Sequence, residues 1–137
     1  MSDVYVNAYK SIYRVLNAST AFKAKVAIAT NVFPLNDPGT PAAGAVVVYG
    51  WPSQQWDAKR GRGVGTLTVM ISSEKNKIEA GDIAQIVRGL LRAKSLTDML
   101  VTWHRIAEQA SPGDGLTSPS GRFEVELTYA VNLIATA

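Results

Sequence analysis

The chain has 137 residues, of which 47% are apolar and 18% charged, and its formal net charge is +3 at pH 7. This length is typical of one domain with one hydrophobic core, and so mild a charge does not by itself select nucleic acid as a partner. The sequence contains no cysteine, which excludes disulfides and thiolate metal sites.

No apolar run approaches the roughly 18 residues needed to cross a bilayer, and the amino terminus lacks the pattern of a signal peptide. We therefore expect a soluble protein without a membrane partner that stays in the compartment where it is made. The charged fraction is low, because about a quarter of the residues in a soluble protein are usually charged. This composition indicates apolar surface that other subunits cover.

The amino-terminal segment from Val4 to Leu16 predicts an amphipathic helix, because apolar residues recur there at helical spacing. A row of tyrosines follows one flank and is more typical of the rim of a core than of a contact stripe: Tyr5, Tyr9 and Tyr13. Ser19 or Thr20 can cap a short second helical turn that runs through Phe22 and Val26.

The next segments favour extended structure. Ile28 to Phe33 predicts a short strand closed by Pro34, and the proline- and glycine-rich stretch from Leu35 to Gly44 predicts a loop. Ala45 to Tyr49 and Gly65 to Ser73 predict two further strands.

The connection from Trp51 to Val64 is about 13 residues long, which is far longer than a simple hairpin requires and predicts a functional loop. It combines aromatic and basic side chains, so we expect it to form an interface with another subunit. The candidate interface residues are Trp51, Trp56, Lys59, Arg60 and Arg62.

The carboxyl-terminal half predicts a second main helix from Ile78 to Lys94, a strand from Met99 to Glu108 and a loop from Ser111 to Gly121. The final segment, Arg122 to Ile134, alternates large apolar residues with small or polar ones, as expected for a long strand with one buried face. The whole chain thus predicts a single α+β domain: a mostly antiparallel, mixed sheet of about five strands with two main helices packed on one face.

In the order of its predicted elements and in the residues that form them, the chain resembles the tail-terminator, or tail-completion, proteins of long-tailed bacteriophages. The resemblance begins with the amphipathic helix of Val4 to Leu16, the strand end Val32 to Pro34 and the strand Val46 to Tyr49. It continues with a strand that leads directly into an amphipathic helix, Leu67 to Leu91, and with the alternating final strand, Phe123 to Leu133.

The resemblance implies a structural virion protein that is not an enzyme and needs no cofactor. Its copies would form a hexameric ring that terminates the tail tube and joins it to the head. The implied partners are further copies of itself, the tail tube protein, the head–tail connector proteins and, transiently, DNA passing through the tail. The implied location is the tail or neck of a virion assembled in the host cytoplasm.

Three patterns could support catalysis, and each has a simpler structural explanation. Gly61, Gly63 and Gly65 precede a strand, whereas a phosphate-binding glycine loop follows a strand and opens a helix. Glu124 and Glu126 could act as an acid and base in sugar hydrolysis, but carboxylates on an exposed strand face are far more common. His104 is the only histidine, so a multi-histidine metal site cannot form, and its neighbours suggest no nucleophile.

The main alternative to the structural role is a small nucleic-acid-binding module that uses the basic loop 56–62. Cations can neutralise phosphates there while nearby tryptophans stack on bases. A few cations in a glycine-flanked loop are more often a solvated tip or a contact with an acidic neighbour.

Overall fold

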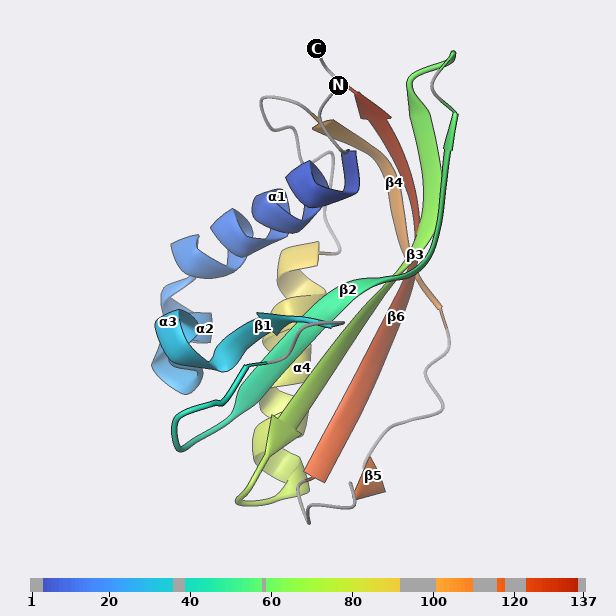
Figure 1. The fold of residues 1–137 in the computed structure, drawn as a ribbon. Helices are drawn as coiled ribbons and strands as arrows, with labels where there is room; N and C mark the ends of the chain where they lie inside the picture. Colours follow the sequence, from blue (N-terminus) through green and yellow to red (C-terminus); the bar gives the residue numbers. More distant parts are fainter. Residues whose placement is uncertain are drawn as a thin grey trace.

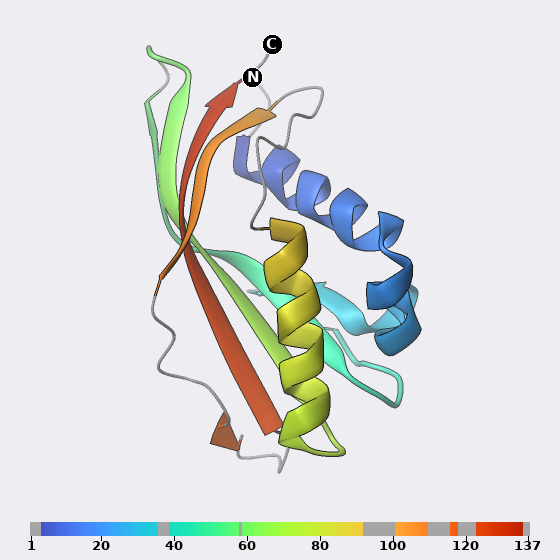
Figure 2. The ribbon, with the colours of Figure 1, turned by 180° about the vertical axis from the view of Figure 1, so that it is seen from behind.

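One mixed sheet with its helices on one face forms the frame of the protein (Figure 1). The computed structural model describes residues 4–35, 39–57, 59–91, 101–109, 116–117 and 123–135. Figures 1 and 2, which view the molecule from opposite sides, show the two longest helices on the same side of the sheet. No helix in these described ranges is both long and apolar enough to span a membrane.

The described elements are two long and two short helices and strands of 2 to 13 residues. The helices are α1 (Val4–Ala18), α2 (Thr20–Lys25), α3 (Ile28–Asn31) and α4 (Lys77–Leu91). The strands are β1 (Val32–Pro34), β2 (Val46–Asp57), β3 (Arg62–Ser73), β4 (Val101–Gln109), β5 (Leu116–Thr117) and β6 (Phe123–Ala135).

The sheet has the strand order β1-β2-β3-β6-β4, and the short β5 pairs with the beginning of β6. Only the β1–β2 pair is parallel among the described strands; the other pairs are antiparallel. This arrangement confirms the predicted α+β class with a mixed, mostly antiparallel sheet and two main helices on one face.

Strand β6 shows the predicted alternation from Glu124 to Ile134. Its side chains facing the helices are at most 3% exposed: Val125, Leu127, Tyr129, Val131 and Leu133. The residues between them are only half-buried. Since successive side chains of a strand point to opposite faces, β6 separates a dry face covered by helices from an outer face.

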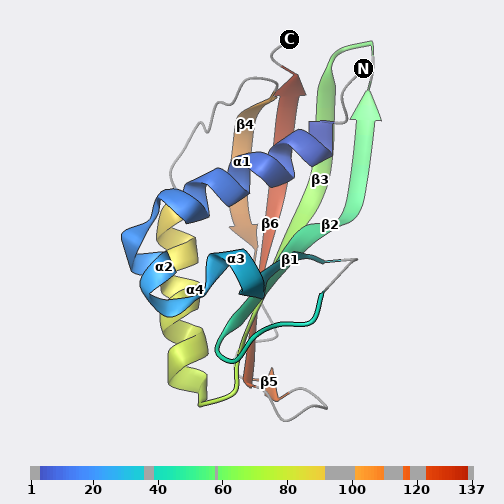
Figure 3. The same ribbon diagram turned by 60° about the vertical axis from the view of Figure 1, so that its left-hand side comes forward.

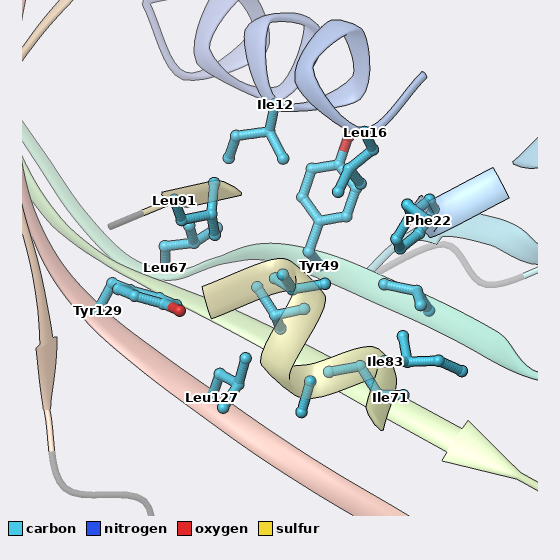
Figure 4. Packing of buried hydrophobic residues seen from close by; sticks show 14 of the residues in the cluster. Ile12, Leu16, Phe22, Tyr49, Leu67, Ile71, Ile83, Leu91, Leu127 and Tyr129 are labelled. Carbon is cyan, nitrogen blue, oxygen red and sulfur yellow. The ribbon is translucent and has the colours of Figure 1, made fainter. Parts of the chain in front are cut away.

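The helices bury their apolar stripes against this dry face (Figure 4). From α1 the buried residues are Ala8, Ile12 and Leu16, and from α4 they are Ala80, Ile83, Ala84, Val87 and Leu91. Each large aliphatic side chain that is fully buried contributes about 1.5–3 kcal/mol relative to its exposed state. The two predicted main helices are therefore confirmed, although the predicted end of the second one, from Arg92 to Lys94, lies outside the described residues.

A pair of tyrosines joins α1 to β2. The rings of Tyr9 and Tyr49 stack with their centroids 4.3 Å apart, and the Tyr49 hydroxyl donates a hydrogen bond of 3.1 Å to the Tyr9 carbonyl oxygen. Burial raises the pKa of Tyr49 strongly, so its hydroxyl remains a donor. For Tyr9, the interpretation of the tyrosine row as the rim of the core is supported.

The prediction of a strand over Ile28 to Phe33 is partly wrong, because Ile28–Asn31 forms the short helix α3 and only Val32–Pro34 is extended. The fully buried Asn31 side chain accounts for the difference. Its Nδ2 donates to the carbonyl oxygens of Ala42 and Ala45 at 3.2 and 3.0 Å, and its Oδ1 accepts from the Ala42 amide at 2.9 Å. A tertiary contact of this kind overrides local strand propensity.

The prediction of a long loop from Trp51 to Val64 is wrong. Strand β2 continues to Asp57 and β3 already begins at Arg62, so these residues form the outer half of a β-hairpin. The predicted loop from Ser111 to Gly121 contains the short strand β5, and the rest of it lies outside the described residues. The predicted strand from Met99 to Glu108 is confirmed over its described part as β4.

Replacing Asn31 with leucine tests the contact that holds the loop before β2. Leucine is similar in size to asparagine but has no side-chain amide. The change therefore leaves the Ala42 amide and the Ala45 carbonyl without this partner. We expect a loss of about 2–4 kcal/mol in the free energy of unfolding, measured by chemical denaturation. The control Asn17→Ala, at an exposed position near the end of α1, should change stability by less than about 0.5 kcal/mol. Equal stability of the two variants would contradict this assignment.

Candidate interaction surface

The outer half of the β2–β3 hairpin, residues 51–65, is called here the hairpin arm. Its strands pair in register from Ser53 opposite Thr66 to Asp57 opposite Arg62. Figure 3 shows the arm at the end of the molecule opposite the connection from β3 to α4. Because β6 runs beside β3 as far as Arg62, the arm is part of the main sheet.

An irregularity at the base of the arm explains why sequence reasoning ended the strand too early. The β2–β3 register shifts between Gly50 and Ser53, and this interval holds Trp51 and Pro52. Proline lacks an amide proton and is tolerated where the ladder is interrupted. Gly50 is required by packing, since a Cβ there would lie 2.7 Å from the Cβ of Leu35. The Gly-Trp-Pro sequence therefore marks a bulge within a strand.

The turn at the tip of the arm is organised by Asp57. Its Oδ1 accepts hydrogen bonds from the backbone amides of Lys59 and Arg60 at 3.1 and 3.2 Å. Gly61 has a φ of +62°, a left-handed conformation that glycine adopts without a steric penalty. The carboxylate and the glycine together fix a tight turn.

Three cations gather at this tip. Lys59, Arg60 and Arg62 are all exposed. Arg60 Nε lies 3.7 Å from Asp57 Oδ2, but both side chains are so exposed, at 78% and 49%, that this ion pair adds little stability. Within the described residues Lys59 and Arg62 form no ion pair. The tip therefore presents exposed basic side chains, two of which form no ion pair in the part of the chain that the structure describes.

Of the two tryptophans of the predicted interface, Trp51 does not form a cluster with these cations. Trp51 is half-buried and packs against the core at the base of the arm, about 20 Å along the strand from the tip at 3.3 Å per residue. The Trp56 backbone pairs with Gly63, but its side chain lies outside what the structure describes. The structure thus brings the three basic residues together and places Trp51 apart from them.

The outer face of the sheet, opposite the helices, is a surface that sequence reasoning did not treat as a site. Along β3 and β6 it carries half-exposed residues that are mostly small, apolar or uncharged: Thr66, Thr68, Met70, Thr128, Ala130 and Asn132. Val64, near the tip, is 58% exposed. The alternation in the two strands contained this signal, because it assigns one face of each strand to the outside.

The patterns considered for catalysis occupy ordinary structural positions. Glu124 and Glu126 are half-exposed on β6, as expected for carboxylates of an open strand face. Gly61 lies in the turn while Gly63 and Gly65 lie inside β3, an arrangement that does not match a phosphate-binding loop. The described residues contain no group of three or more metal-ligating side chains. His104 lies at a register shift of β4, and its side chain is outside the description.

The fold has a counterpart in a virus-like particle. A chain of the structure "Virion of native gene transfer agent (GTA) particle" superposes with a TM-score of 0.73 at 16% sequence identity. The match covers 97% of this chain and 99% of that chain, so the two share their fold from end to end. No protein-family model matches the sequence, and no curated protein does.

Two glycine substitutions test the geometry of the turn. A Cβ at Gly61 or at Gly81 in α4 would meet no atom within 4 Å, so only the backbone conformation distinguishes the two sites. Gly61→Ala should lower the free energy of unfolding by about 1–2 kcal/mol because of the left-handed φ. Gly81→Ala should raise it by about 0.5–1 kcal/mol because alanine favours the helix. Thermal denaturation measures both, and shifts of the same sign would refute the assigned turn.

Proposed function

We propose that this protein is a structural virion protein whose copies form a ring that terminates the tail tube of a phage-like particle and joins it to the head connector. The observation that carries the proposal is the end-to-end likeness of the fold to a chain of a gene transfer agent virion. The sequence resemblance to phage tail-terminator proteins supports the more specific role at the end of the tail.

The surface of the subunit is suited to assembly. Charged residues make up 18% of the chain, and along β3 and β6 the outer face is mostly uncharged between its two ends. A face of this kind loses little solvation energy when another protein covers it. The hairpin arm adds a projecting contact at one end of the subunit. In this proposal the partners are further copies of the chain, the tube protein and the connector.

The proposed role is assembly in place of catalysis. Glu124 and Glu126 lie half-exposed on a strand face, which is an ordinary place for solvated surface carboxylates. The proposed location is the tail or neck of a virion assembled in the host cytoplasm, where the basic tip could meet passing DNA.

A second candidate function is nucleic-acid binding, and the exposed cluster of Lys59, Arg60 and Arg62 favours it. With only three cations and the adjacent Asp57, the tip offers few phosphate contacts. Tight and specific nucleic-acid binding usually involves more contacts and a larger interface. The tip is therefore better suited to a contact within an assembly.

We expect the purified protein to form rings, either freely or when tube is added as a template. Mass photometry and sedimentation should show one discrete oligomer in place of a continuous series, because a closed ring has a fixed number of subunits. Negative-stain images should show annular particles or capped tube ends. A protein that stays monomeric at high concentration and ignores added tubes would argue against the proposed function.

Binding to free DNA should be weak and should disappear near physiological salt, where the screening length is about 8 Å. Fluorescence anisotropy with labelled duplex and single strands measures this across a salt series. Replacing Lys59, Arg60 and Arg62 with serine should damage assembly, or the infectivity of particles that carry the change, more than it changes DNA affinity.

A matched control replaces three other exposed lysines with serine: Lys10, Lys23 and Lys25. It removes the same charge from the chain but leaves the tip intact, so assembly should be preserved. Sub-micromolar DNA binding at physiological salt that only the tip variant loses would favour the second candidate function.

A further inference from the structure

The outer face of the sheet carries opposite charges at its two ends. At one end lies the tip of the hairpin arm, where Lys59, Arg60 and Arg62 outnumber Asp57 and leave a net charge of +2 (three positive, one negative). At the other end lie Glu124 and Glu126, whose two carboxylates carry charges that sum to −2. Glu126 also interacts within its own chain, so a partner copy would add to that interaction. We call these two groups the basic tip and the acidic pair.

The acidic pair lies on the outer face because of the register of β6. Glu126 is opposite Met70 and Glu124 is opposite Ser72, whereas the residues on either side of Glu126, Val125 and Leu127, are buried under the helices. Two positions along one strand separate the carboxylates by about 7 Å. That spacing allows two cationic side chains to be bound side by side.

The basic tip is held in shape before it meets a partner. Asp57 accepts hydrogen bonds from the backbone amides of Lys59 and Arg60, and Gly61 supplies the left-handed conformation of the turn. Arg62 and Val64 both belong to the outward-facing positions of β3, so a charged and an apolar group lie together near the tip. A preorganised turn loses less conformational entropy when it docks.

The two charged groups cannot meet within one chain. Arg62 is opposite Ile134, while Met70 and Ser72 are opposite Glu126 and Glu124, so eight to ten residues of paired strand, about 26–33 Å, separate the basic tip from the acidic pair. Strands β3 and β6 both lie in the centre of the sheet, with a paired strand on each side. A contact between these groups therefore requires a second copy of the chain.

From this charge complementarity we infer that the basic tip of one copy docks on the acidic pair of the next copy, in a head-to-tail contact that closes the ring. The inference rests on the proposed function and names the surfaces through which the ring forms. Because the two surfaces differ, the contact is heterologous, and its repetition generates a ring where the rotation closes and an open filament where it does not. Exposed Val64 and half-exposed Met70 are placed to add apolar contact beside the ion pairs.

Charge reversal tests this contact. A tip variant, Arg60→Glu with Arg62→Glu, changes the net charge of the tip from +2 to −2 while Lys59 and Asp57 remain. A pair variant, Glu124→Lys with Glu126→Lys, changes the acidic pair from −2 to +2. Each variant alone should need at least a tenfold higher protein concentration to assemble than the wild-type protein. Mass photometry under the conditions in which the wild-type protein assembles measures this.

Mixing the two variants in equal amounts should restore assembly, because alternating subunits then oppose unlike charges at every contact. A chain that carries all four substitutions should assemble alone for the same reason. This restoration also shows that both variants are folded. The control Lys23→Glu with Lys25→Glu reverses two exposed charges on α2, away from both surfaces, and should assemble like the wild type.

Several outcomes would overturn the inference without affecting the proposed function. Rings that form normally from either single variant would place the contact elsewhere on the subunit. Restored particles that contain only two chains would indicate reciprocal pairing of outer faces in place of head-to-tail closure. A tip variant that stays defective with the pair variant but loses DNA binding would assign the tip to nucleic acid. A wild-type protein that never associates would instead count against the proposed function itself.

Discussion

The antiparallel pairing of β3 with β6 is the constraint on which the other parts of the structure depend. It extends over twelve residue pairs, from Arg62 opposite Ile134 to Ser73 opposite Phe123. Because side chains alternate along both strands, this single register decides which residues enter the core and which face outward. A shift by one residue would place Leu127 and Tyr129 on the outer face and bring Glu126 and Thr128 under α4, at a cost that no local gain could offset.

The same ladder explains how a small domain projects a stable arm. An isolated two-stranded hairpin is only marginally stable in water. Here β6 continues beside β3 up to Arg62, so the outer half of the hairpin gains a third strand. The bulge after Gly50 interrupts the ladder without ending β2. Leu35 lies close to the base of the arm, where its amide donates a hydrogen bond of 2.8 Å to the Tyr49 carbonyl oxygen. The projecting tip is thus supported by the strand that also forms the centre of the core.

Periodicity in the sequence was sufficient to predict the elements whose stability comes from one buried stripe or face. The α1 stripe with Ile12 and Leu16, the α4 stripe with Ile83 and Val87, and the alternation of β6 are all of this kind. The errors arose where a distant contact decides the local conformation. Asn31 is helical because it binds the backbone at Ala42 and Ala45, eleven and fourteen residues ahead. Trp51 and Pro52 interrupt the alternation of β2, although the strand continues beyond them.

The candidate site could be predicted in composition but not in shape. The cluster of Lys59, Arg60 and Arg62 is visible in the sequence, whereas its position at the end of a paired arm depends on the ladder with β6. In the sequence Glu124 and Glu126 are indistinguishable from ordinary surface carboxylates, because their distance from the tip also depends on this ladder. Only the register shows that both groups share one face of a rigid sheet. The sheet holds the basic tip and the acidic pair about 26–33 Å apart, so these two groups can contact each other only between molecules. The register that builds the core therefore also sets the distance between the two charged groups on the surface.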